Sequence, residues 1–230
     1  MKKILICYGT RPEYIKIEPI ILHDLSQFHD IKTLFTGQHK DIVQASVKPT
    51  YSLEMNACAP NRLNSIVANI TGSYAFDQIL SDGFTHVLVQ GDTASAFACA
   101  LAAFNKGIKV IHLEAGLRTG DKSHPFPEEA YRQCISRITD IHLCATYYNF
   151  RSLLKESITE AEMHVVGNTV LDHLKDVSIS YNNDILITLH RRENHKFIPF
   201  WYSQIEDLAE QNPSLNFVFV AHPNPNTRCV

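Results

Sequence analysis

The sequence predicts an α/β protein with a Rossmann-like, doubly wound parallel sheet, followed by the start of a second Rossmann-like domain. The first observation is that short apolar runs of strand length alternate along the chain with helical segments, an order typical of parallel sheets. The second is a polar cluster at 178–184 (SISYNND), after which a new apolar run begins. We therefore expect an N-terminal Rossmann-like domain over 1–177 and an incomplete second domain over 178–230.

The strand predictions depend on continuous apolar runs, which are typical of strands buried on both faces of a sheet. Strands are predicted, in order, at 4–8, 31–35, 85–89, 109–113, 141–145, 164–166, 185–189 and 216–221. The first run follows two lysines, and because it is short and leads into Gly9 we interpret it as a strand and not as a signal peptide.

The helix predictions depend on residues that favour helix ends. Pro12 suits the first turn of a helix, Glu13 favours the helix dipole there, and Gly107 ends an alanine-rich helix. Helices are predicted from Pro12, from near Asp41, within 61–80, at 94–104, from Pro127, at 147–155 and at 198–210. The segment 48–61 receives no assignment.

The composition excludes several classes of function. The chain has 230 residues, 45% of them hydrophobic and 20% charged, with a net charge of −3, so we expect no nucleic-acid partner. No run approaches the ~20 apolar residues of a membrane helix, so we expect no membrane partner. The six cysteines form no C-x-x-C pair and are predicted to be free thiols, which indicates a reducing, cytoplasmic location.

Three carboxylates lie in or just after loops that follow predicted strands: Asp92, Glu114 and Glu128. Ligands of open α/β sheets bind at the carboxyl ends of the strands, so these positions suit a small-molecule site. Glu114 directly follows a buried strand and must be paired or have a raised pKa. Asp92 could instead only cap the next helix, and Glu128 could only favour its helix N-terminus. Both alternatives remain open.

Basic residues occupy two similar positions. Arg11 lies between the first strand and a helix N-terminus, where a guanidinium and backbone N–H groups would suit a phosphate. His190, Arg191 and Arg192 follow a later strand, and such a group suggests an anionic ligand. A surface ion pair for Arg11 and a solvated loop for the second group are the alternatives.

Several common motifs are absent. No strand is followed by G-x-G-x-x-G, and the chain has neither a P-loop nor a G-x-S-x-G elbow. His112 and Glu114 lack companions at metal-ligand spacing. We therefore predict no cofactor and no metal.

A series of motifs resembles the non-hydrolysing UDP-N-acetylglucosamine 2-epimerase family. The matching stretches are Gly9–Glu13 with Ile15-Lys16, Gly91–Thr93, Glu114–Gly120, Pro127–Ala130, Gly167–Thr169, His190–Asn194 and His222–Asn226. They occur in family order from the start of the chain to its end. The resemblance implies two Rossmann-like domains of the glycosyltransferase-B type. It also implies interconversion of UDP-N-acetylglucosamine and UDP-N-acetylmannosamine, through elimination of UDP to a glycal and its re-addition.

The same resemblance assigns roles to individual residues. It implies that Asp92, Glu114 and Glu128 are acid/base carboxylates, without telling which of them is the base. It implies that His190 either stabilises the leaving diphosphate or acts as an acid. The implied substrate contacts are Arg11, Arg118, Arg191, Asn194, His222 and Asn226. A regulatory substrate site is implied near Gln38 and His39, although an arginine expected there is Asn69.

The resemblance also implies that family loops holding uridine and diphosphate lie beyond Val230. We therefore expect a C-terminally truncated member with impaired activity, whose partners are a UDP-sugar and either a second copy in a homodimer or a complementing C-terminal fragment. Two other functions remain open. One is a hydrolysing 2-epimerase that releases N-acetylmannosamine and UDP, and the other is a non-catalytic remnant that binds nucleotide sugars.

Overall fold

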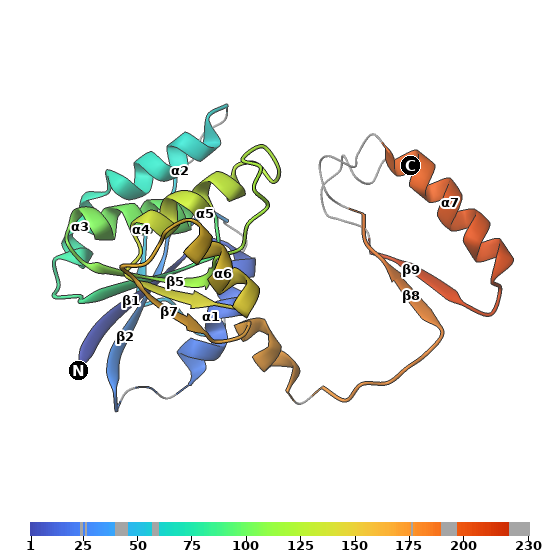
Figure 1. The fold of residues 1–230 in the computed structure, drawn as a ribbon, viewed down its shortest axis with the longest axis horizontal. Helices are drawn as coiled ribbons and strands as arrows, with labels where there is room; N and C mark the ends of the chain where they lie inside the picture. The colour runs from blue at the N-terminus through green and yellow to red at the C-terminus, as the bar shows by residue number, and fades with distance from the viewer. Residues whose placement is uncertain are drawn as a thin grey trace. The chain divides into compact units, whose positions relative to one another are not determined.

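The computed structural model describes residues 1–23, 25, 27–39, 46–56, 60–175, 177–189 and 197–220. The chain divides into two compact units, Met1–Asp176 and Val177–Val230, which are described separately below. The prediction of a doubly wound, Rossmann-like α/β fold is confirmed, because the first unit is a parallel sheet with helices on both faces (Figure 1).

The sheet of the first unit has seven strands in the order β3-β2-β1-β4-β5-β6-β7, all parallel. The strands are β1 (Lys2–Tyr8), β2 (His29–Phe35), β3 (Tyr51–Ser52), β4 (His86–Gln90), β5 (Lys109–Ala115), β6 (Ile141–Cys144) and β7 (Glu162–Val165). The order reverses direction between β1 and β4, and in open sheets such a switch point is where ligands bind.

The helices form two layers. They are α1 (Arg11–Leu22), α2 (Arg62–Thr71), α3 (Tyr74–Leu80), α4 (Ala94–Asn105), α5 (Glu128–Arg137) and α6 (Tyr147–Lys155), followed by a short 3-10 helix, η1 (Thr169–Leu174). Helix α1 covers one face of the sheet, and α2, α3, α4 and α5 cover the other (Figure 1). All alanines of α4 except Ala102 are buried, so this helix packs closely against the centre of the sheet.

The structure differs from the sequence predictions in several strand bounds and in three larger details. The single helix expected within 61–80 is two helices, since Gly72 ends α2 and the Ser73 side chain caps α3. Residues 51–52 of the unassigned segment pair with β2 as an edge strand. The strand expected at 109–113 continues to Ala115, so Glu114 belongs to β5 and does not follow it.

The second unit is small. It contains β8 (Asp184–Ile187) and β9 (Asn216–Phe219), which pair in parallel, and the connecting helix α7 (Ile198–Gln211). Leu186, Phe200 and Trp201 are exposed in it. A strand, a helix and a parallel strand form one crossover unit, the repeating element of a Rossmann-like sheet. No helix within the described ranges is long and apolar enough to cross a membrane.

Gly116 permits a close contact just after β5. Its φ is +82°, and a Cβ atom there would overlap the backbone oxygen of Asn149 in the first turn of α6. Asn149 is itself buried and closes a capping box with Thr146. The β5–α5 connection therefore runs directly against the backbone of the first turn of α6.

Replacement of Gly116 by alanine is expected to lower the free energy of unfolding by about 2–5 kcal/mol, since left-handed strain and a backbone clash add together. Gly83→Ala is the matched control, because Gly83 has a similar φ of +73° but no atom within 4 Å of the place that a Cβ would take. That control should lose only about 1–2 kcal/mol. Urea midpoints of both variants test the clash, and an equal loss in the two would contradict it.

Candidate active site

The candidate site is built where β1, β4 and β5 end and where α5 begins. Arg11 begins α1, Asp92 lies in the loop between β4 and α4, Glu128 begins α5, and the end of β5 carries Glu114. Because neighbouring parallel strands end at one edge of the sheet, residues far apart in the sequence meet there.

Glu13 joins two of these loops. Its buried carboxylate accepts hydrogen bonds from the backbone N–H groups of Gly9 (2.9 Å) and Thr10 (2.6 Å) and from the Thr93 hydroxyl (2.7 Å). Burial raises the pKa of Glu13, although its hydrogen bonds act in the opposite direction. The sequence had suggested that backbone N–H groups beside Arg11 would bind a phosphate. The N–H groups of Gly9 and Thr10 instead donate to Glu13 and are not available to a phosphate.

Asp92 has a cationic partner. Its Oδ2 atom accepts from Nε of Arg132 and lies 2.7 Å from Nη2 of the same side chain. The helix that follows is capped by Thr93, whose hydroxyl accepts from the Ala96 N–H at 3.0 Å. The alternative that Asp92 is merely this helix's cap is therefore wrong.

Glu114 owes its orientation to a β-bulge. The pairing of β5 with β6 shifts register between Leu113 and Ala115, and Glu114 has a φ of +64°. Strict alternation would place Glu114 on the same face as His112, but the bulge turns it to Lys16 of α1, with which it forms an ion pair. Gln90 also donates to this carboxylate. Glu114 is thus paired, one of the two states the sequence allowed for it.

Glu128 and Glu129 are neighbours on α5 with opposite surroundings. Glu128 is the first residue of the helix, and its Oε2 atom is buried without a hydrogen-bond partner among the described residues. Glu129 is fully buried and accepts from Thr119, Gly120, Arg132 and Gln133. Burial opposes the ionisation of Glu129, but these donors outweigh it and hold its pKa below the ordinary value.

Two buried histidines lie on adjacent strands beneath the Asp92 loop. His112 donates from Nε2 to the Gly91 carbonyl oxygen at 2.7 Å, which leaves its buried Nδ1 atom without a partner in the described ranges. Both ring nitrogens of His142 are buried and lack partners there as well. Burial is the main reason that the pKa of His112 falls to about 4 and that of His142 to about 3, and the nearby Arg118 charge contributes to both decreases.

Other predicted site residues are engaged in the fold. Arg118 is largely buried and donates from Nε and Nη2 to the Glu156 carboxylate (2.5 and 2.9 Å), and also to Ser136. Its donors thus hold the β5–α5 loop to α6, and a substrate contact by Arg118 finds no support in this geometry. Arg11 is exposed at the first position of α1.

The predicted regulatory pair lies at the end of β2. The Gln38 side-chain oxygen accepts from the backbone and hydroxyl of Ser95 (3.0 and 2.7 Å), so it supports the start of α4. The His39 N–H donates to the Gly9 carbonyl at 2.8 Å. Five further predicted residues lie outside the described residues: His190, Arg191, Asn194, His222 and Asn226.

Sequence reasoning missed the partners of the carboxylates, namely Lys16, Gln90, Glu129 and Arg132. Lys16 and Gln90 carry no local signal, because their partner is distant in sequence. Two signals were available. Thr10-x-x-Glu13 is the spacing of a capping box, and Glu129 with Arg132 has the i, i+3 spacing of a helical ion pair.

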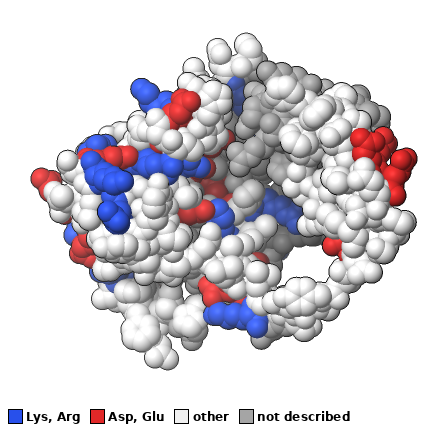
Figure 2. All heavy atoms as spheres, turned by 45° about the vertical axis from the view of Figure 1, so that its right-hand side comes forward, with Lys and Arg blue, Asp and Glu red and all other residues white. Residues whose placement is uncertain are grey.

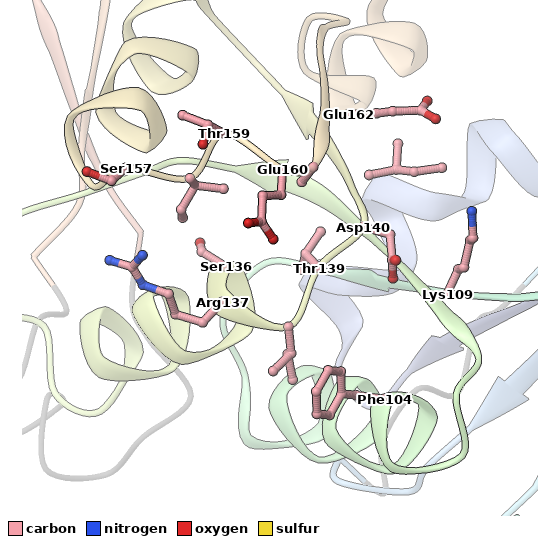
Figure 3. Close-up of a pocket in the computed structure, with 14 residues that line it drawn as sticks. Phe104, Lys109, Ser136, Arg137, Thr139, Asp140, Ser157, Thr159, Glu160 and Glu162 are labelled. Atoms are coloured by element: carbon pink, nitrogen blue, oxygen red, sulfur yellow. The ribbon is translucent and has the colours of Figure 1, made fainter.

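The amino ends of the strands, on the side of the sheet opposite to the candidate site, carry none of the predicted site residues. A cavity of about 450 Å³ lies there, lined by polar and charged side chains from the α5–β6 and α6–β7 connections, such as Ser136, Arg137, Asp140 and Glu160 (Figure 3). Basic and acidic side chains are interspersed on the face of this unit seen in Figure 2, without a large field of one sign. Within the part of the chain that is described, no group of three His, Cys, Asp or Glu could hold a metal ion.

The chain is similar to known epimerases over nearly its whole length. The sequence profile of the family described as UDP-N-acetylglucosamine 2-epimerase matches residues 23–230. A UDP-N-acetylglucosamine 2-epimerase of Salmonella borreze is 35% identical over 256 residues, covering 99% of this chain and 67% of that protein. One from Neisseria meningitidis serogroup A is 38% identical, covering 98% and 67%.

The fold is shared with solved structures as well. The crystal structure of a UDP-GlcNAc 2-epimerase from Neisseria meningitidis bound to UDP-GlcNAc superposes with a TM-score of 0.84 at 37% identity. That match covers 98% of this chain and 67% of the other. The chain thus spans about two thirds of the length of these relatives.

The two buried histidines predict a loss of stability in mild acid. Their folded pKa values lie below the ordinary value of 6.5, so the unfolded chain binds more protons between that value and about 4. Their contribution to stability is therefore complete above pH 6.5 and declines as the pH falls toward 4. Urea midpoints at pH 7 and pH 5 should show this decline in a range where most carboxylates remain ionised.

A His142→Leu variant should lose less stability between pH 7 and pH 5, because it removes a titrating group and two unpartnered buried nitrogens. His164→Leu, at an exposed position of β7, serves as the control and should keep the parental loss. An unchanged pH dependence in His142→Leu would rule out this origin of acid sensitivity.

Proposed function

Because the chain belongs to the UDP-N-acetylglucosamine 2-epimerase family, we propose that it interconverts UDP-N-acetylglucosamine and UDP-N-acetylmannosamine by elimination and re-addition of UDP. The observation that supports this most is the set of three carboxylates at one sheet edge: Asp92 paired with Arg132, Glu114 paired with Lys16, and Glu128 with an unengaged oxygen. The Neisseria meningitidis relative, which is bound to UDP-GlcNAc, supports the class of ligand.

The proposed reaction explains why several carboxylates are required. A base takes the proton from C2, the C2–H electron pair forms the C1=C2 double bond of a glycal, and the C1–O bond breaks as UDP leaves with its electron pair. Return of a proton to the opposite face of C2 and of UDP to C1 gives the epimer. Since the C2 proton is not acidic, both a positioned base and a stabilised leaving group are needed.

The ion-pair partners of the three carboxylates suggest which role each carboxylate has in the reaction. A carboxylate that transfers protons is most available when no cation holds it, and Glu128 has no ion pair among the described residues, whereas Asp92 and Glu114 each have one. We therefore assign Glu128 a direct proton transfer. Lys16 and Arg132 fix Glu114 and Asp92 in place, so these two carboxylates act from set positions.

The leaving diphosphate would meet positive charge at Arg11, which is exposed where α1 starts. His190 is assigned the same task by resemblance and lies outside the described residues. The homodimer and the cytoplasmic location stay predictions.

Proton transfer at C2 is tested by incubating the chain with UDP-N-acetylglucosamine in deuterated water. Recovered UDP-sugar of both configurations should carry deuterium at C2, detected by NMR and mass spectrometry. Release of free N-acetylmannosamine and UDP would instead indicate the hydrolysing reaction. Absence of both deuterium and free sugar would overturn the proposed activity of this chain and favour a non-catalytic binding protein.

Glu128→Gln should slow the deuterium exchange by about 100-fold or more, because general acid–base groups typically contribute 10²–10⁴-fold. The urea midpoint should not fall, since no hydrogen bond within the described residues is lost at Oε2. Glu160→Gln, at the cavity on the opposite edge of the sheet, is the matched control and should exchange at the parental rate. Parental exchange in Glu128→Gln would show that another group transfers the proton.

A further inference from the structure

Glu129 differs from the other acidic residues of the site because it is wholly buried and fully engaged. Its Oε2 accepts from the Thr119 N–H (3.1 Å) and from Arg132 Nη1 (3.2 Å). Its Oε1 accepts from the Gly120 N–H (3.3 Å) and from Gln133 Nε2 (3.0 Å). Every neighbour of this carboxylate is a donor, so the position requires an ionised acid and not an amide.

Arg132 extends the contact from Glu129 to Asp92. The guanidinium uses Nη1 for Glu129 and Nε and Nη2 for Oδ2 of Asp92, the last two at 2.7 Å. Planar guanidinium groups have a rigid set of donors, so a carboxylate that fixes one edge also fixes the direction of the others. The Oδ1 atom of Asp92 has no hydrogen-bond partner among the described residues and is left for a ligand.

We propose that Glu129 is a positioning residue that orients Arg132, and through it the carboxylate of Asp92, for the reaction at the sheet edge. The importance of this positioning for catalysis rests on the proposed epimerase function. The adjacent carboxylates thus have different tasks: Glu128 keeps a free oxygen, while Glu129 has none and arranges its surroundings. Because Glu129 also holds Thr119 and Gly120, one buried charge sets both the Asp92 side chain and the loop before Glu128.

A purely structural role for Glu129 predicts something different. A carboxylate that only stabilised the start of α5 could be replaced with a loss of stability but without a change in the Arg132–Asp92 contact. A positioning residue must alter that contact. The two roles can therefore be separated by observing the guanidinium itself.

The test is the NMR signal of the Arg132 Nε–H group in the 230-residue chain, assigned by its loss in Arg132→Lys. In the parent, the hydrogen bond to Asp92 should protect this proton from exchange with solvent. Glu129→Gln places an amide N–H₂ among donors, so the protection should fall at least 10-fold. Glu128→Gln is the matched control one residue away and should keep the parental signal.

Activity provides the second readout. Glu129→Gln should lower kcat for C2 exchange by roughly 100-fold with little change in KM, the expected effect of a misplaced catalytic group. Should Glu129→Gln reduce the folded fraction, Arg132→Lys replaces it, since lysine keeps the charge but cannot reproduce the forked contact. It should lower kcat at least 10-fold in fully folded protein.

Unchanged Nε–H protection in folded Glu129→Gln, or parental kcat in folded Arg132→Lys, would overturn the positioning role. A parent that shows no C2 exchange at all would overturn the proposed function instead. In that case the Nε–H signal still decides whether Glu129 orients Arg132, so the two failures can be told apart.

Discussion

The buried carboxylate of Glu13 is the contact on which the candidate site most depends. It receives the backbone donors that follow β1 and the Thr93 hydroxyl that follows β4, so the two loops at the switch point of the sheet share one anion. A carboxylate removed from water is stable only when donors surround it, and both loops supply donors to Glu13. Glu13 therefore fixes the loop that carries Asp92, whereas the Asp92 side chain itself is held by Arg132.

At the other two parts of the site, the end of β5 and the start of α5, a carboxylate is likewise held by several hydrogen-bond donors. At β5, a bulge and a left-handed backbone at Glu114 cost about 1–2 kcal/mol, and the ion pair with Lys16 and the contact with Gln90 offset this cost. At α5, Glu129 gathers the donors of Thr119 and Gly120 and holds Arg132. At β5 the catalytic candidate itself is held by its donors, whereas at α5 the buried Glu129 holds the surroundings of Asp92 and Glu128. Glu128 alone among the three catalytic candidates keeps an unengaged buried oxygen within the described part of the chain.

Most of the fold could be predicted from the sequence, because its signals are local. Apolar runs gave the strands β1, β2, β4 and β5, and the helix α6 was predicted with the bounds it has. The errors have local causes too. Gly72 and Ser73 divide one predicted helix into two, and β3 is only two residues long and pairs with β2 at the edge of the sheet, so it leaves little periodicity to detect.

The sequence by itself determined which residue types follow the strands, and the resemblance added the reaction that those types suit. It could not decide which carboxylate is paired, because Lys16 and Glu114 are 98 positions apart and Asp92 and Arg132 are 40 apart. Nor could it show that Arg118 forms an ion pair with Glu156, since the hydrophobic periodicity of the sequence does not reveal the path of the β5–α5 loop against α6. Pairing depends on distances across the sheet, and only the tertiary structure brings the partners within reach of one another.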